Sequence, residues 1–430
     1  MVLLKRLHRL GGVRLGGLRH LRRPGGLRGR YPAQFWMLFS GNFVSTIGLS
    51  MIWPFMMIYA SRRLQLPLTA VASLLTINSA FLLAGTFLAG SLADRVGRRG
   101  IMIVGMALHG TAYLLFSFAD SVWMFALLMA LGGFVTPVYR VGVDAMVADL
   151  IPEERRVSAF AVLRMGNNAG VAIGPSIGGF LATQSYSIIF YCAAAGLLAY
   201  SLFTFLFVKE TIPRTPELGP VARERFGGYL RVARDRVFVA VCGGFIIVTI
   251  GASLMFVLLA VYAKTQFGLP ESRFGFIMAT NAAMVVVFQV MVTAVSRRFR
   301  PYRVMALGTL LYVVGVGSVA LGSSFLTFLA SMVVLTVGEL LLVPTTSALV
   351  ANLAPPDMRG RYMSIYGLSW GIAAGIGPVF GGILNDAIAP RAIWVGGALV
   401  CLAGFVVFAA LALREGKGTE GAEPSLEKRV

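Results

Sequence analysis

The stretch that decides the fold reads Gly90-Ser91-Leu92-Ala93-Asp94-Arg95-Val96-Gly97-Arg98-Arg99, and it lies between two long apolar runs. Gly90 and Gly97 lack a Cβ atom, so helix ends can approach closely there. Arginines at a membrane edge hold a loop on the cytoplasmic side. A carboxylate such as Asp94 is costly at this boundary unless it pairs with an arginine or meets the N-terminal end of another helix. The stretch therefore predicts a tight cytoplasmic turn between two membrane helices.

The composition of the chain is that of an integral membrane protein. Of its 430 residues, 57% are hydrophobic and only 13% are charged, which excludes an ordinary soluble domain. The formal net charge is +20, from 38 basic and 18 acidic residues. The basic residues lie in short loops and tails beside apolar runs, so this charge indicates membrane topology and not nucleic-acid binding.

Apolar runs long enough to cross a bilayer recur along the chain, since a core of about 30 Å needs about 20 apolar residues per helix. Basic residues gather in every second loop, although Arg62 and Arg63 are exceptions. By the positive-inside rule, both termini are expected in the cytoplasm. The predicted spans are 36–60, 70–91, 101–118, 122–148, 158–183, 187–208, 238–263, 274–296, 304–322, 325–351, 362–386 and 391–413.

Landmarks that recur at a fixed offset predict a duplicated chain. Residues 203 apart agree in type, as Gly174-Pro175 and Gly377-Pro378 do. A constant offset indicates two related halves. We therefore expect an all-α membrane protein of twelve transmembrane helices in two pseudo-symmetric six-helix bundles. The expected parts are a basic cytoplasmic tail at 1–35, a first bundle at 36–208, a cytoplasmic linker at 209–237, a second bundle at 238–413 and a cytoplasmic tail at 414–430.

Residues 90–99 resemble the loop 2-3 signature of the major facilitator superfamily, G-x-L-x-D-R-x-G-R-R, with every specified position filled. The resemblance implies that Asp94 meets the N-terminus of the eleventh helix. It also implies that Arg98 pairs with a carboxylate at the end of the fourth helix, here Asp149. In this superfamily the substrate site lies near mid-bilayer between the halves. The remaining residues of the implied conformational switch are Gly90, Arg95 and Gly97.

A glycine-rich stretch in the fifth span resembles the helix 5 signature of proton-coupled antiporters in the same superfamily. It reads Gly170-x-x-x-Gly174-Pro175-x-x-Gly178-Gly179. Proline kinks a helix, and small residues let a neighbouring helix pack tightly, which limits leak through the interface. Ordinary helix packing produces the same pattern, and a copy recurs at residues 377–382. We interpret the stretch as favouring efflux.

Ionisable residues inside spans indicate functional sites. Glu339 lies near the middle of the tenth span, where desolvation favours a protonated carboxyl and suits a proton carrier. The structural alternative is a carboxyl held by a neighbouring hydroxyl or amide. Arg140 and Asp144 lie one helical turn apart in the fourth span, and the antiparallel fifth span is expected to bring Arg164 to a similar depth. These three residues are expected either to couple protonation to substrate release or to join the two spans.

Other polar residues in the spans are weaker candidates. His109 is interpreted as a packing residue, because no acidic residue lies near it in its span. The side chains that are expected to line the cavity if their helix faces allow it are Asn42, Trp53, Asn281, Gln289 and Trp370.

These patterns predict a secondary transporter. The sequence contains no H-E-x-x-H, no C-x-x-C and no G-x-x-x-x-G-K-[ST], so it offers no metalloenzyme or nucleotide-driven pump motif. Proton-coupled efflux of lipophilic or drug-like molecules is favoured, because Met, Phe and Leu predominate in the central spans and hydrogen-bonding groups are few. Flipping of a lipid or glycolipid, or uptake of a polar solute such as a sugar, stays open. We expect a monomer in the cell inner membrane, with a small-molecule substrate and protons as partners and with neither cofactor nor metal.

Overall fold

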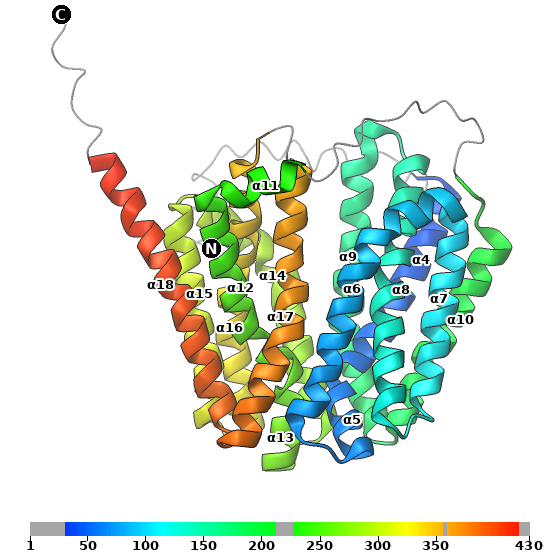
Figure 1. Ribbon diagram of the computed structural model, residues 1–430, viewed down its shortest axis with the longest axis horizontal. Coiled ribbons are helices and arrows are strands. Elements are labelled where there is room, and N and C mark those ends of the chain that lie inside the picture. Colours follow the sequence, from blue (N-terminus) through cyan, green and yellow to red (C-terminus); the bar gives the residue numbers. More distant parts are fainter. Residues whose placement is uncertain (1–30, 212–226, 356–358, 421–430) are drawn as a thin grey trace, which may run out of the picture.

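A computed structural model describes residues 31–211, 227–355 and 359–420, and the regular elements in these ranges are all helices. The tail predicted at residues 1–35 and the linker predicted at residues 209–237 therefore lie largely outside the described residues. The described parts of that linker are residues 209–211 and 227–237, which include the short helix α11 (Gly227–Arg234). Helix α11 lies at the upper end of the view in Figure 1.

The helices form the two predicted bundles. The first contains α4 (Ala33–Ile52), η2 (Trp53–Phe55), α5 (Met56–Leu64), α6 (Leu68–Val96), α7 (Arg98–Phe116), α8 (Val122–Leu150), α9 (Glu153–Ala182) and α10 (Tyr186–Phe207). The second contains α12 (Arg236–Val257), α13 (Leu259–Phe267), α14 (Glu271–Ser296), α15 (Pro301–Ser318), η3 (Val319–Leu321), α16 (Phe325–Leu353), α17 (Arg359–Ala387) and α18 (Ala392–Glu420). The bundles meet through α6 with α17 and α9 with α14. Their ribbons converge at the lower end of Figure 1 and diverge toward the upper end.

The predicted all-α membrane fold is confirmed, and one helix differs from the rest in composition. In the described residues, eleven helical segments are long and apolar enough to cross a bilayer. The 30-residue α9 is also long enough, at about 1.5 Å per residue. It is less apolar because Arg164, Asn167 and Asn168 lie in its middle. The count of twelve spans therefore depends on including α9. The face of α9 that carries these three residues lines a cavity and does not contact lipid.

The turn predicted at residues 90–99 is shorter than expected. Helix α6 continues to Val96 and α7 starts at Arg98, so Gly97 alone separates them. Gly97 has a φ of 94°, a conformation that glycine adopts without steric cost. Most of the signature is thus helical, and the sharp reversal depends on a single glycine.

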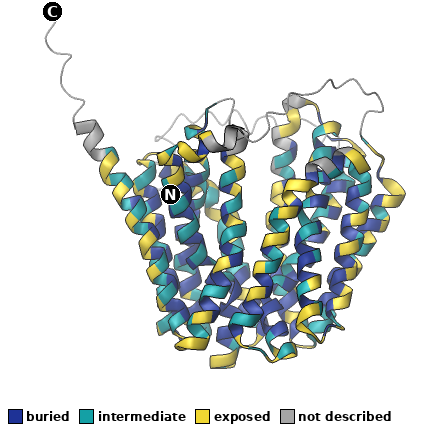
Figure 2. Ribbon diagram, in the orientation of Figure 1, coloured by how far each residue is buried: buried dark blue, intermediate teal, exposed yellow. Residues whose placement is uncertain are grey.

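Burial follows the pattern expected for helices in lipid. Figure 2 shows buried residues inside each bundle and exposed residues along the outer faces. Many of the exposed side chains are large and apolar, including Phe87, Trp123 and Val290. A helix that is apolar on every side suits a position between a protein core and lipid.

The two ends of the bundles differ in charge. One end, which we call the basic end, carries Arg98, Arg156 and Arg297. The opposite end carries the connections at 117–121, 183–185 and 322–324. The exceptional Arg63 lies at this opposite end, where it forms an ion pair of 2.5 Å with Asp120. This ion pair neutralises one of the two exceptional arginines at the opposite end.

The charge asymmetry gives a topology that cysteine labelling can check. In a variant without the native cysteines, we expect Ser323→Cys at the opposite end to react with a membrane-impermeant maleimide in intact cells. Phe299→Cys at the basic end is exposed to a similar extent, and it should react only after permeabilisation. The reverse pattern would place the basic end outside the cell.

Candidate functional site

The signature stretch ends at an ion pair between Arg98 and Asp149, which joins α7 to the end of α8. This is the pair that the family resemblance implied. Of the other signature residues, Arg95 is exposed. Gly90 and Asp94 lie in α6 but outside the residues whose side chains are described, so the structure does not show the predicted contact of Asp94.

Two residues that follow α10 contact the same turn. The carboxylate of Glu210 accepts the backbone N–H of Arg99 at 3.0 Å, and the hydroxyl of Thr211 donates to Asp149 at 2.7 Å. A Cβ atom at Gly97 would lie 2.7 Å from a carboxylate oxygen of Glu210. These contacts could not be predicted from the sequence, because no pattern in it indicates that the chain after the sixth span folds back over this turn.

The glycine-rich stretch of α9 packs against both bundles. Its residues are Gly170, Gly174, Pro175, Gly178 and Gly179. A Cβ atom at Gly178 would lie 2.4 Å from the carbonyl oxygen of Met51 in α4. At Gly179 it would lie 2.6 Å from the carbonyl oxygen of Glu271 in α14 of the other bundle. Because backbone atoms cannot yield as side chains do, these positions require glycine for close contact.

A cavity with a volume of about 550 Å³ lies between α4, α8 and α9 of the first bundle. It is lined by Asn42, Ser45, Thr46, Leu49, Thr136, Tyr139, Arg140, Asp144, Phe160, Leu163, Arg164, Asn167, Asn168 and Val171. We call this space the large cavity. The expected scarcity of hydrogen-bonding groups does not hold here, because most of the lining residues are polar.

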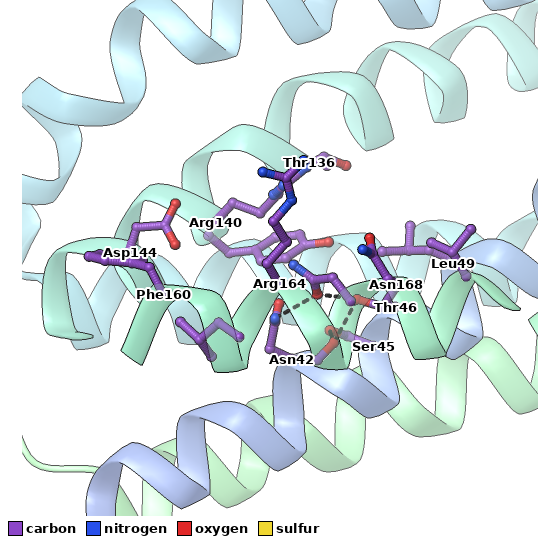
Figure 3. Close-up of a pocket in the computed structure, with 14 residues that line it drawn as sticks. Asn42, Ser45, Thr46, Leu49, Thr136, Arg140, Asp144, Phe160, Arg164 and Asn168 are labelled. Carbon is purple, nitrogen blue, oxygen red and sulfur yellow. Dashed lines mark hydrogen bonds between the residues drawn. The ribbon is translucent and has the colours of Figure 1, made fainter. Parts of the chain in front are cut away.

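The structure brings Arg140, Asp144 and Arg164 into the large cavity (Figure 3). The expected ionic network is not formed. Arg140 and Asp144 lie one turn apart on α8, yet the described part of the chain shows no ion pair or hydrogen bond for any of the three. The spacing of Arg140 and Asp144 predicted their shared helix face but not the directions of their side chains.

A group of hydrogen bonds orders the amides beside these charges. The amide oxygen of Asn167 accepts from the amide of Asn42 at 2.7 Å and from the hydroxyl of Thr46 at 2.9 Å. Dashed lines in Figure 3 mark these bonds. The single hydroxyl proton of Thr46 is shared with the carbonyl oxygen of Asn42, which lies 2.8 Å away. The oxygen of Asn167 is thus the accepting part of the amide, and its NH₂ group remains available to donate.

Glu339 lies on α16 and accepts a hydrogen bond of 2.8 Å from the amide of Asn281 on α14. The same amide donates to the hydroxyl of Thr336 at 2.9 Å. Asn281 also lines a smaller cavity of about 130 Å³ between the bundles, together with Trp53. Val171 lines this smaller cavity and the large cavity alike, so the two spaces are neighbours.

The remaining candidates have packing roles. His109 is buried and packs on the ring of Tyr113, with centroids 4.6 Å apart. Trp370 packs edge-on against Phe245, and the amide of Gln289 donates to the hydroxyl of Thr293 on its own helix at 3.0 Å. In the described residues, no group of three or more His, Cys, Asp or Glu side chains is arranged to hold a metal ion.

Asp386, which the sequence analysis missed, joins the bundles at the opposite end. Its carboxylate accepts the backbone N–H groups of Leu68 at 3.3 Å and Thr69 at 2.8 Å, and the hydroxyl of Thr69 at 2.7 Å. Helix α6 starts after Pro67, which supplies no side-chain cap. Asp386 therefore caps α6 from the other bundle. One sign was available in the sequence: a carboxylate at the C-terminal end of its own helix is unfavourable without a partner.

A second cross-bundle group lies at the same end. Glu271 is only 4% exposed and forms an ion pair with Lys264. The hydroxyl of Tyr186, in the first bundle, donates to Glu271. The pairing of the two charges and the tyrosine hydroxyl offset the cost of burying the carboxylate. In the described residues, the hydrogen bonds that join the bundles all lie in the half of the molecule away from the basic end.

Comparison with known proteins agrees with this architecture. Residues 38–270 and 241–429 match the family described as Major Facilitator Superfamily. The chain is 27% identical to the uncharacterized MFS-type transporter YhjO of Bacillus subtilis (87% of this chain, 92% of the relative). It is 27% identical to a Na(+), Li(+), K(+)/H(+) antiporter of Planococcus maritimus (79% and 86%) and 25% identical to Multidrug resistance protein 1 of Bacillus subtilis (81% and 89%).

A solved structure shows the same fold. A POT family transporter in complex with 5-aminolevulinic acid superposes with a TM-score of 0.75 at 17% identity, over 91% of this chain and 98% of that one. At this identity the likeness extends to the arrangement of helices and not to the ligand.

Removal of the Asp386 carboxylate should loosen the opposite end. We expect Asp386→Ala to raise the labelling rate of Ser79→Cys, a buried α6 position against α17, roughly tenfold, since a hydrogen bond to a charged group contributes about 1.5–3 kcal/mol. The matched control is Ser73→Ala, because that hydroxyl bonds only within α6. An unchanged labelling rate in Asp386→Ala would show that the cap does not hold the bundles together.

Proposed function

This chain belongs to the major facilitator superfamily and is a multi-pass membrane transporter, and on that premise we propose that it exports small organic molecules in exchange for protons by alternating access. The basic end is cytoplasmic in this proposal, and the protein acts as a monomer in the cell inner membrane. The observation that carries it is a polar cavity in the first bundle that adjoins, at Val171, a smaller cavity lined by Asn281, the hydrogen-bond partner of Glu339 in the second bundle.

The cross-bundle contacts support alternating access. Asp386 and Glu271 join the bundles at the opposite end, whereas the ribbons diverge toward the basic end (Figure 1). In the proposed cycle, this conformation is the one that receives a substrate from the cytoplasm, as an exporter requires. A ligand shifts a transporter to its other conformation only through contacts that differ between the two.

Helices α6 and α17 are suited to carry the change. In the described conformation, Asp386 at the end of α17 caps the start of α6. The signature implies the converse contact, in which Asp94 at the end of α6 meets the start of α17. In one conformation the carboxylate of α17 would thus cap the start of α6, and in the other conformation the carboxylate of α6 would cap the start of α17. The ion pair of Arg98 with Asp149 keeps the Gly97 turn on the first bundle meanwhile.

Proton coupling fits the surroundings of Glu339. Its hydrogen-bond partner Asn281 lines the smaller cavity between the bundles, and Val171 separates that space from the large cavity. A substrate that reaches Val171 therefore approaches the acid through one amide. Substrate binding is then able to change the protonation of Glu339, and protonation is able to change substrate affinity, as coupling requires.

Export is favoured by the packing of α9 and by two relatives. Gly179 lies directly on the backbone of α14, which suits the leak-limiting role of the antiporter signature. The names of the two relatives are those of a cation/proton antiporter and a multidrug resistance protein. The polar lining of the large cavity favours an amphipathic substrate over a purely lipophilic one.

Glu339→Gln should separate binding from coupling. The amide keeps the size and can still pair with Asn281, but it cannot release a proton. In inside-out vesicles with a proton-sensitive dye and a panel of organic cations, organic anions and sugars, we expect the variant to lose substrate-induced proton movement and uphill accumulation. Facilitated exchange of labelled substrate should remain.

Two comparisons make this result specific. Glu339→Asp keeps a titratable group and should retain part of the proton movement, and Thr336→Ala removes a neighbouring hydroxyl without touching the carboxyl. Full coupling in Glu339→Gln would transfer the proton-carrying role to Asp144.

A further inference from the structure

We propose that the transported molecule is an amphipathic organic anion, and that Arg140 and Arg164 hold its carboxylate, phosphate or sulfonate group in the large cavity. This inference rests on the proposed function and names the substrate class. It starts from the charge of the cavity lining. Two guanidinium groups and one carboxylate, that of Asp144, face this space, so its formal charge is +1 (two minus one).

Neither arginine forms an ion pair at contact distance in the described residues. Asp144 is the nearest acid in sequence to Arg140, yet the two do not form an ion pair, and Arg164 has no hydrogen bond or ion pair there either. Both side chains are exposed to the cavity. By contrast, Arg98, Arg63 and Lys264 elsewhere in the chain each pair with an acid.

An unpaired arginine at membrane depth is unfavourable and usually marks a substrate or ion pathway. A guanidinium group presents parallel N–H donors that match the two oxygens of a carboxylate or phosphate. Arg140 on α8 and Arg164 on α9 line the same space from two helices (Figure 3). An anion placed between them would neutralise the excess charge and link these two helices.

The neighbouring amides also favour an acceptor on the ligand. The oxygen of Asn167 accepts a hydrogen bond from the amide of Asn42 and shares the hydroxyl proton of Thr46 with the carbonyl oxygen of Asn42. This fixes the orientation of the amide and leaves its NH₂ group to donate. Asn167 therefore offers a hydrogen-bond donor to the cavity, as the two guanidinium groups do.

The rest of the lining accommodates an apolar body. Leu49, Phe160, Leu163 and Val171 line the same cavity. Its volume of about 550 Å³ falls within the range of about 300–1,000 Å³ that is usual for drug-sized ligands. Val171 leads toward the smaller cavity and Glu339, so an anionic head at the arginines leaves the apolar part directed to the bundle interface.

The test compares matched aromatic probes that differ in charge. The full-length protein in phosphatidylcholine nanodiscs is titrated with naphthoate, naphthyl phosphate and naphthalene sulfonate, and with neutral naphthyl methanol and cationic naphthylmethyl ammonium. Empty nanodiscs correct for partition into lipid. We expect the anions to bind at least about tenfold more tightly than the neutral and cationic probes. Equal affinity, or preference for the cation, overturns the proposal.

Variants locate the binding. Arg140→Gln and Arg164→Gln should each weaken anion binding about tenfold and leave the neutral probe unaffected. Arg140→Lys and Arg164→Lys keep the charge and lose the paired donors, so intermediate losses are expected, and they serve if a Gln variant fails to fold. Arg297→Gln, an exposed residue outside the cavity, is the matched control. Loss of binding in Arg297→Gln equal to that in the cavity variants counts against the site.

The source of the anionic group is decided by a further arm. In nanodiscs that contain phosphatidylglycerol, the lipid headgroup is tested as a competitor of naphthyl phosphate. Competition that is present in the wild type and absent in Arg164→Gln shows that a lipid headgroup supplies the anion. Absence of competition assigns the site to a free solute. Proton movement in the vesicle assay is measured separately. If the protein transports cations with proton movement and binds no anion, the substrate class proposed here is wrong and the proton coupling stands. If it binds anions without proton movement, the proposed coupling is wrong and the anion site stands.

Discussion

Asp386 caps the first turn of a helix in the other bundle, and much of the described conformation depends on this contact. Helix α6 begins after a proline that provides no side-chain cap, and the carboxylate of Asp386 would be unfavourable at the end of its own helix. Each half therefore supplies what the other lacks. Together with the hydrogen bond from Tyr186 to Glu271, this contact joins the two bundles at the opposite end.

Charge inside the bundles is divided between two sites with different partners. In the first bundle, Arg140 and Arg164 face the large cavity without an ionic partner among the described residues. In the second, Glu339 is held by the amide of Asn281. A basic site that awaits a ligand and an acidic site that is already hydrogen-bonded are suited to different tasks, and we assign substrate binding to the first and proton exchange to the second.

Much of the fold could be predicted from the sequence, and the site only in part. Hydropathy placed the spans within a few residues, because each helix must cover the same bilayer thickness, and the resemblance implied the pair of Arg98 and Asp149. It was harder to predict which side of each helix faces the cavity, because helices that contact both lipid and protein are apolar on all sides. For this reason the large share of polar side chains in the lining of the large cavity was not expected. Asp386, whose partner lies 317 residues away, could not be assigned.

The most direct test is a pair of distances measured in the same protein population by electron paramagnetic resonance. Spin labels at Val96 and Met363 report on the basic ends of α6 and α17, and labels at Trp123 and Leu326 report on the opposite ends of the two bundles; all four positions are exposed. Alternating access predicts that acidification or a transported solute shortens the first distance and lengthens the second in the same fraction of molecules. Distances that change in the same direction, or an opposite end that never opens, would contradict it.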